Sequence, residues 1–275
     1  MTESESRPLL NGPLTLAAIG LDIVPCDKKA NLSRAAAAIK DLAGHADVAI
    51  LPEMFSTGYI LDGEKARALA EPSDGPTIEW ATATASACNM AVAGSFIALD
   101  HYGRLFNRAF FTEPSGETTY YDKRHLFAPG GENNVYTPGN APIPLVRFRG
   151  WNIAIAVCYD LRFPVWLRNI RGAYDLLIVV ADWPDSRAYA WKQLLIARAI
   201  ENQAYVAGCN RCGEDSFGTY AGTSAIIDPK GNVIGTEAHT PDGTQCVVSR
   251  ISRSALYDFR EKFPAFLHGD TFTID

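Results

Sequence analysis

Short apolar runs alternate along the chain with longer stretches in which apolar residues recur at helical spacing. The apolar runs are rich in small and β-branched residues, so each predicts a buried strand. The amphipathic stretches predict helices. The first of these runs from Asp27, a residue type that caps helices, to Ala43, and Gly44 ends it. Because no linker or repeat interrupts the alternation, it predicts one α/β domain with two packed sheets.

Turn residues between the runs define the remaining elements. Residues 105–112 and 117–122 flank a Pro-Ser-Gly turn and predict an antiparallel pair. Residues 223–228 and 232–237 likewise predict a hairpin about a Pro-Lys-Gly turn, and Ser186 can cap a helix that continues to Glu201. The other expected strands cover residues 14–23, 47–51, 90–99, 151–157, 175–181, 204–209 and 245–251, and the other expected helices cover residues 77–89 and 164–170.

Charge and composition narrow the class of protein. The 275 residues carry a net charge of −6 without a basic run, which argues against nucleic acid or an anionic membrane as partner. No apolar stretch reaches the roughly 20 residues of a membrane span. Residues 1–13 are polar and lack the hydrophobic segment of a signal peptide, so we expect a disordered tail before a domain over residues 14–275. Six scattered cysteines do not make a disulfide framework, which favours a cytoplasmic protein.

Three chemically useful side chains follow three of the predicted strands, namely Glu53, Lys123 and Cys158. In open α/β sheets, functional groups gather at the carboxyl ends of the strands. Cys158 also stands on a tight turn before the expected helix over residues 164–170, where free backbone N–H groups can bind an anion. The carboxylate could take the thiol proton, and the ammonium could stabilise the oxyanion formed on attack at a carbonyl. The three residues together predict a cysteine nucleophile.

Each of these residues also has a structural interpretation. A single cysteine is more often a small buried hydrophobe, Glu53 could be a solvated loop residue, and Lys123 lies in a charged turn. A dyad of Cys158 with His125 is a weaker alternative. Cys209 and Cys212 form a CxxC pair that could serve thiol or metal chemistry, but no second pair accompanies it and zinc needs about four ligands.

The segments around these three strand ends resemble the signature blocks of the nitrilase superfamily of carbon–nitrogen hydrolases. The order of the blocks and their separations along the chain also match, and the resemblance extends from about Leu14 to Asp275. The form of the third block, with residues 181–184 and 260–264, is most similar to the ω-amidase (2-oxoglutaramate amidase) branch. The three blocks are Leu51-Pro52-Glu53-Met54-Phe55, Tyr121-Asp122-Lys123-Arg124-His125-Leu126-Phe127 and Val157-Cys158-Tyr159-Asp160-Leu161-Arg162-Phe163-Pro164.

The resemblance implies a fold, a reaction and an assembly. The fold is an αββα sandwich of two mixed sheets flanked by helices, which forms a homodimer or a higher homo-oligomer and uses no cofactor or metal. Cys158 would be the nucleophile, Glu53 the general base and Lys123 the oxyanion stabiliser. The reaction would hydrolyse a small carboxamide to acid and ammonia through a thioester. The implied substrate is 2-oxoglutaramate or 2-oxosuccinamate.

Further site residues follow from the same resemblance. The backbone N–H of Tyr159 would be a second oxyanion donor, and Glu132 matches another family glutamate, although it could also be a surface loop carboxylate. Trp183 would line the substrate site or be a core aromatic. The branch usually has Asn before this Trp-Pro, whereas this chain has Asp182. The added charge could disfavour an anionic keto acid, or it could be paired with Arg187.

Other interpretations remain open at this stage. We expect Asp160 and Arg162, which flank the nucleophile, to form an ion pair that holds the turn rather than to contact the substrate. Within the same class, the chain could hydrolyse N-carbamoyl amino acids, another small amide or a nitrile. In a different class, it could be a catalytically silent binding protein, although the intact Glu53, Lys123 and Cys158 argue against this.

Overall fold

The computed structural model of the chain describes residues 12–270 and 272–274. The helices in this part of the chain are α1 (Lys28–Asp41), α2 (Gly63–Leu69), α3 (Pro76–Cys88), α4 (Ala188–Asn202) and α5 (Arg253–Lys262). The strands are β1 (Leu14–Gly20), β2 (Val48–Ile50), β3 (Ala91–Leu99), β4 (Leu105–Thr112), β5 (Thr118–Asp122), β6 (Leu145–Phe148), β7 (Trp151–Val157), β8 (Leu176–Ala181), β9 (Tyr205–Asn210), β10 (Cys212–Asp215), β11 (Gly218–Ala221), β12 (Ala225–Ile227), β13 (Thr236–His239) and β14 (Gln245–Ile251).

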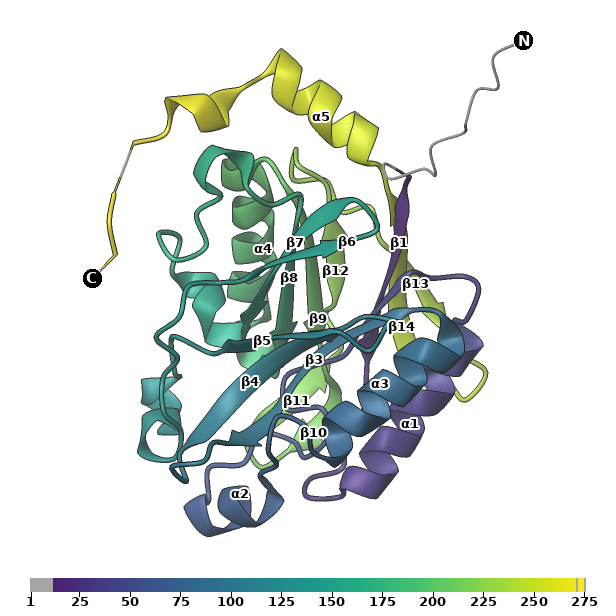
Figure 1. Cartoon of the computed structure of the whole chain (residues 1–275), viewed down its shortest axis with the longest axis vertical. Coiled ribbons are helices and arrows are strands. Elements are labelled where there is room, and N and C mark those ends of the chain that lie inside the picture. The colour runs from purple at the N-terminus through teal and green to yellow at the C-terminus, as the bar shows by residue number, and fades with distance from the viewer. Residues whose placement is uncertain (1–11, 271, 275) are drawn as a thin grey trace.

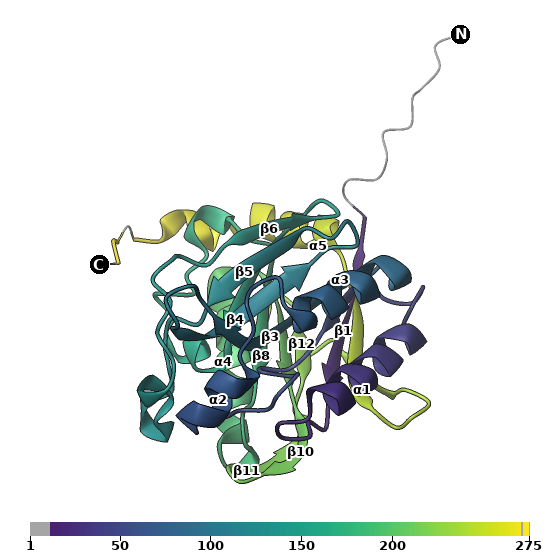
Figure 2. The same cartoon turned by 60° about the horizontal axis from the view of Figure 1, so that its bottom comes forward.

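Two mixed sheets lie at the centre of the molecule (Figure 1). Over the described residues, the seven-stranded sheet has the order β13-β14-β1-β2-β3-β4-β5 and the five-stranded sheet the order β12-β9-β8-β7-β6. Strands β1, β2 and β3 run parallel, as do β7, β8 and β9, and the other neighbours in these sheets pair antiparallel. The hairpin β10–β11 lies at the same end of the molecule as α2 (Figure 2).

The alternation of side chains along each strand divides the apolar residues between separate layers. On β1, Leu16 and Ala18 face the core between the sheets, where they belong to the same cluster as Ile155 of β7. The intervening Ala17 and Ile19 pack in the cluster that holds the apolar faces of α1 and α3. On the far side of the molecule, α4 covers the five-stranded sheet. The layers are therefore α, β, β, α, which confirms the fold class expected from the sequence.

Most predicted elements are present within a few residues of their expected bounds. The side chain of Asp27 caps α1 by accepting a hydrogen bond from the backbone N–H of Ala30 at 3.0 Å. Helix α4 begins one residue later than expected, because Arg187 rather than Ser186 occupies its N-cap position. The expected tail over residues 1–13 lies almost entirely outside the described residues. No helix among the described residues has the length and apolar character needed to cross a membrane.

The helix expected over residues 164–170 is absent, and that prediction was wrong. The chain instead forms turns there, because the Asn169 side chain binds the backbone of Tyr174. Its amide donates to the Tyr174 carbonyl at 2.9 Å, and its oxygen accepts from the Tyr174 N–H at 2.9 Å. Such local bonds between side chain and backbone compete with helix formation.

The hairpin expected over residues 223–237 is only partly formed. Its turn exists, since the Asp228 N–H donates to the carbonyl of Asn232 at 2.9 Å. Beyond the turn the two arms separate: β12 pairs with β9 in one sheet, and β13 pairs with β14 in the other. Gly235 allows this crossing, because a Cβ there would lie 2.3 Å from a side-chain carbon of Val247.

Candidate active site

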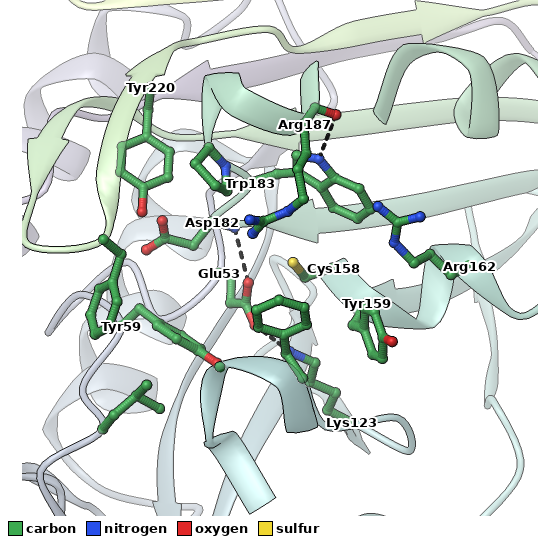
Figure 3. A pocket seen from close by; sticks show the side chains of 15 residues that line it. Glu53, Tyr59, Lys123, Cys158, Tyr159, Arg162, Asp182, Trp183, Arg187 and Tyr220 are labelled. Atoms are coloured by element: carbon green, nitrogen blue, oxygen red, sulfur yellow. Dashed lines mark hydrogen bonds and ion pairs between the residues drawn. The ribbon is translucent and has the colours of Figure 1, made fainter. Parts of the chain in front are cut away.

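A pocket of about 120 Å³ opens where the two sheets end side by side (Figure 3). Glu53 follows β2 and Lys123 follows β5, both in the seven-stranded sheet, whereas Cys158 follows β7 in the five-stranded sheet. The structure therefore brings together the three residues expected from the sequence, and all three line the pocket. The other lining residues are Tyr59, Leu61, Phe127, Gly130, Tyr159, Arg162, Asp182, Trp183, Pro184, Arg187, Phe217 and Tyr220.

The ammonium group of Lys123 lies between two buried carboxylates. Its Nζ is 2.8 Å from Oε1 of Glu53 and 2.8 Å from Oε2 of Glu132. The side-chain amide of Asn107 donates to the same two carboxylates, at 2.6 Å and 3.2 Å. The backbone N–H of Phe127 donates to Glu132 at 2.6 Å. Glu132 is thus a buried partner of Lys123, and the interpretation as a surface loop carboxylate was wrong.

These contacts keep Lys123 charged although water cannot reach it. Burial alone lowers the pKa of a lysine, but Glu132 and Glu53 raise the pKa of Lys123 well above its ordinary value. A permanent ammonium at the bottom of the pocket suits the stabilisation of a developing oxyanion.

Cys158 stands on a strained turn. Its φ of 45° is uncommon for a residue other than glycine, and it opens the short 3₁₀ helix Cys158–Arg162. The carboxylate of Asp160 stabilises this turn by accepting a hydrogen bond from the backbone N–H of Val157 at 3.2 Å. At the start of a helix the backbone N–H groups have no partner within the helix, so the N–H of Tyr159 suits the expected oxyanion donor.

Asp160 binds other groups than Arg162, the partner expected from the sequence. It accepts hydrogen bonds from the hydroxyl of Tyr121 at 2.9 Å and from the backbone N–H of His125 at 2.9 Å. The His125 ring also contacts Asp160 at 2.8 Å and stacks on Phe163, and His125 is not among the residues that line the pocket. The expected ion pair with Arg162 does not form, because Asp160 is fully buried and already satisfied, whereas Arg162 lies in the pocket wall.

The resting thiol of Cys158 is neutral. Burial, followed by the nearby carboxylate of Glu53, raises the pKa of Cys158 well above its ordinary value, and Lys123 offsets only part of this. A neutral thiol needs a base at the moment of attack. The carboxylate of Glu53 lies near enough to take this proton: its Oε1 binds Lys123 and Asn107, and its Oε2 accepts a hydrogen bond from the Asp182 N–H at 2.9 Å.

Trp183 is both a core aromatic and a pocket-lining residue, the two interpretations that the sequence left open. It is buried with its ring 5.4 Å from that of Trp191, and it also lines the pocket. Its backbone N–H donates to the side chain of Asn210 at 2.8 Å, which anchors the end of β8 to the end of β9. The Tyr159 ring lines the pocket beside Phe127, with ring centroids 5.1 Å apart.

Two arginines contribute positive charge to the pocket. Figure 3 shows Arg162 beside Trp183, and Arg187 nearby. The Arg162 guanidinium lies over the ring of Trp183 at 4.9 Å, and that of Arg187 lies over the ring of Phe127 at 5.0 Å. Within the described part of the chain, neither forms an ion pair with a carboxylate. Both are therefore available to the carboxylate of a bound anion.

Asp182 also lines the pocket, and its partner differs from the expected one. Its nearest cation is Arg211, at 3.7 Å, rather than Arg187. Arg211 lies closer to Asp215, at 2.6 Å. Burial is the main cause that raises the pKa of Asp182 to about 7, and Glu53 raises it further while Arg211 lowers it.

Some residues of the site were missed in the sequence. Asn107 had only a weak signal, because Arg108 beside it in β4 is also polar, and only the structure shows that Asn107 faces the buried carboxylates. Tyr59 had none, since it lies in a loop before α2 and reaches the pocket only through the fold. Arg162 and Arg187 were noticed, but their place in the pocket wall was not predicted.

The CxxC pair lies outside the pocket lining. The Cys209 thiol is buried and donates to the backbone carbonyl of Ile50 at 3.1 Å, and that of Cys212 contacts the Gln245 side chain at 3.2 Å. Among the residues that the structure describes, no cluster of three or more His, Cys, Asp or Glu side chains could hold a metal ion.

Known proteins resemble this chain over nearly its whole length. The family model for carbon–nitrogen hydrolases matches residues 15–261. A protein of Escherichia coli K12 named omega-amidase YafV is 44% identical over 254 residues, which cover 92% of this chain and 95% of that protein. The 2-oxoglutaramate amidase of Bacillus subtilis is 32% identical over 255 residues, which cover 92% of this chain and 96% of that one.

Solved structures agree with the sequence comparisons. XC1258 from Xanthomonas campestris, described as a CN-hydrolase superfamily protein with an arsenic adduct in its active site, has a TM-score of 0.89 and 39% identity, covering 96% of this chain and 100% of that one. Nit3 of Saccharomyces cerevisiae, described as a nitrilase superfamily member, shares the fold with a TM-score of 0.81 at 22% identity, covering 93% of this chain and 96% of its own. With this fold and these relatives, the chain belongs to the carbon–nitrogen hydrolase family of the nitrilase superfamily and is a hydrolase of carbon–nitrogen bonds.

Proposed function

We propose that this hydrolase is an ω-amidase, which cleaves the terminal carboxamide of a small 2-oxo acid through a thioester on Cys158. The observation that carries the chemistry is the placement of Lys123 between two buried carboxylates at the bottom of the pocket that Cys158 lines. The names of the relatives support the substrate class, since they include omega-amidase and 2-oxoglutaramate amidase.

Acylation begins with the neutral thiol. Glu53 takes the thiol proton as the sulfur of Cys158 bonds to the amide carbon, and the carbonyl electrons move onto oxygen. Lys123 and the backbone N–H of Tyr159 stabilise this oxyanion. The carbon–nitrogen bond then breaks, and the proton held by Glu53 passes to the nitrogen, which leaves as ammonia.

Deacylation uses the same groups in the same roles. Glu53 removes a proton from a water molecule that attacks the thioester carbon, and the oxyanion again rests against Lys123. The carbon–sulfur bond breaks, the thiolate regains the proton from Glu53, and the acid leaves. Glu132 keeps Lys123 in position throughout, because it binds the ammonium through both oxygens, at 3.0 Å and 2.8 Å.

The pocket supports a small anionic substrate. Its volume of about 120 Å³ suits a small molecule rather than a peptide. Arg162 and Arg187 can bind the substrate carboxylate while the carboxamide lies against Cys158. We propose 2-oxoglutaramate or 2-oxosuccinamate as the substrate.

Ammonia release tests the proposed function. Purified enzyme should release ammonia from 2-oxoglutaramate, and the activity should vanish in Cys158→Ala and in Glu53→Gln. Cys212→Ser is the matched control, because this thiol lies outside the pocket and should be dispensable. Mass spectrometry of rapidly quenched enzyme should show the acyl group on Cys158. Wild-type turnover in Cys158→Ala would disprove the mechanism. If ammonia were released faster from N-carbamoyl amino acids than from 2-oxoglutaramate, the proposed substrate class would be wrong.

A further inference from the structure

Unsatisfied buried polar atoms are concentrated in the pocket. In the described part of the chain, four buried side-chain atoms have no hydrogen-bond partner, and three of these belong to pocket-lining residues. They are both carboxyl oxygens of Asp182 and the hydroxyl of Tyr59. Because an unpaired buried polar group costs free energy, such a concentration indicates a wall built to contact a polar ligand.

Burial and the carboxylate of Glu53 disfavour the negative charge of Asp182, and Arg211 offsets only part of this effect. The Arg211 guanidinium lies 3.7 Å from Asp182 but 2.6 Å from Asp215, and the Tyr220 hydroxyl donates to Asp215 at 3.1 Å. On its other side lies the carboxylate of Glu53, whose Oε2 accepts the Asp182 backbone N–H. Only 1% of the Asp182 side chain is exposed, so water does not compensate. An ionised carboxylate without a hydrogen bond is costly in such a place.

We propose that Asp182 is a specificity-determining residue, whose neutral carboxyl group donates a hydrogen bond to an acceptor oxygen on the acyl chain of the substrate. The neutral acid presents an O–H to the pocket, as an asparagine would present an N–H. It therefore accepts a 2-oxo acid, whose oxygens are acceptors. A substrate with an ammonium group in the same place, such as L-glutamine, finds no matching acceptor charge.

The inference has a pH signature. Because burial raises the pKa of Asp182 to about 7, the neutral form dominates at pH 6 and is a small fraction at pH 9. If only the neutral form binds, the dissociation constant should rise about 100-fold between pH 6 and pH 9. The carboxylate of a 2-oxo acid does not titrate in this range, so the change originates in the protein.

Binding to an inactive enzyme measures this signature without interference from catalysis. We would titrate Cys158→Ala with 2-oxoglutaramate by calorimetry between pH 6 and pH 9, and repeat the series with Cys158→Ala/Asp182→Asn. Asparagine keeps a donor but does not titrate, so the affinity of the double variant for 2-oxoglutaramate should not change with pH. Asp258→Asn, which neutralises an exposed carboxylate on α5, is the control and should follow the parent. A flat parent profile for 2-oxoglutaramate would overturn the proposal, as would binding of L-glutamine to the parent at pH 6 as tight as that of 2-oxoglutaramate.

A second measurement separates this inference from the proposed function on which it rests. Carbon NMR of enzyme labelled at aspartate carboxyl groups should show a resonance that is absent in Asp182→Asn and titrates near pH 7 without any ligand. If 2-oxoglutaramate binds at no pH, the proposed function has failed. The titration of the labelled Asp182 carboxyl group then tests by itself whether this group is neutral in the pocket. A resonance already ionised at pH 6 would overturn it.

Discussion

The side-chain amide of Asn107 donates to Oε1 of Glu53 at 2.6 Å and fixes the orientation of that carboxylate. Because Oε1 is thus occupied by Asn107 and by Lys123, Oε2 is the oxygen that would exchange protons with Cys158 in the proposed mechanism. Asn107, a residue of β4 that is not itself part of the pocket lining, would therefore select the oxygen that acts as the base.

Asn107→Leu should lower kcat about 10- to 100-fold, because a hydrogen bond to a charged group contributes about 1.5–3 kcal/mol. KM should change little, since Asn107 is not part of the pocket lining. Steady-state ammonia release measures both constants. Asn140→Leu, at an exposed position, is the control. A large rise in KM with unchanged kcat would contradict the role given to Asn107.

Glu132→Gln should slow acylation about 10²- to 10³-fold, the range typical for loss of an oxyanion-stabilising donor. The variant keeps the size of the side chain, but it removes one of the two charges that raise the pKa of Lys123. A rapid-quench measurement of acyl-enzyme formation isolates this step. Acylation at the wild-type rate would show that Glu53 alone suffices to hold the ammonium.

Tyr59→Phe should leave the melting temperature unchanged or raise it, because the hydroxyl is buried without a partner. Tyr136→Phe is the matched control: its hydroxyl donates to the carbonyl of Ile60 at 2.6 Å, so its loss should lower stability. If the Tyr59 hydroxyl contacts the substrate, kcat/KM should fall roughly 2- to 10-fold in the first variant. Loss of stability in Tyr59→Phe would show that the hydroxyl has a partner in the folded chain.

Arg187→Met should raise KM for an anionic amide about 10- to 100-fold, the range for a charge-assisted hydrogen bond. A neutral amide such as propionamide has no carboxylate to bind, so its kinetics should not change. The comparison of the two substrates therefore distinguishes a lost contact from a damaged pocket. An equal rise in KM for both substrates would indicate that the substitution has damaged the pocket.

Asp182→Asn should stabilise the protein more at pH 8 than at pH 5. The pKa of Asp182 is about 7 in the folded chain, against about 3.9 for an unfolded aspartate. The folded chain therefore binds this proton more tightly, and wild-type stability falls as the pH rises from about 4 to about 7. The asparagine variant lacks this loss, so its advantage in melting temperature should grow across the same range. An advantage that does not change with pH would contradict the raised pKa.

The sequence predicted those parts of the fold and site that depend on short segments. Strand periodicity identified most strands of the two large sheets, although it missed β6 and the hairpin β10–β11. The position of Glu53, Lys123 and Cys158 after strands anticipated that they would meet. The structure placed all three in one pocket, as expected. What they do there was a prediction from the sequence and remains a proposal.

Errors arose where a segment is governed by partners far away in the chain. The turn after Phe163 has helix-compatible residues, but Asn169 also binds Asn202, 33 residues away: its side-chain amide donates to the Asn202 carbonyl at 3.0 Å, and its backbone N–H donates to the Asn202 side chain at 2.9 Å. Glu132 looked like a loop residue because nothing local shows that its loop folds inward onto Lys123. Periodicity carries no information about such contacts.

The proposed base, Glu53, and the ammonium of Lys123 follow strands of one sheet, and the thiol of Cys158 follows a strand of the other. In the proposed mechanism, reactivity therefore depends on the spacing between two separately hydrogen-bonded sheets, which the layer of apolar side chains between them helps to maintain. A cavity opened in that layer, for example by Ile155→Ala, would let the sheets shift before either lost its strands. The turnover number would then report on the distance between the sheets. On heating, activity should be lost at a lower temperature than the one at which the fold unfolds.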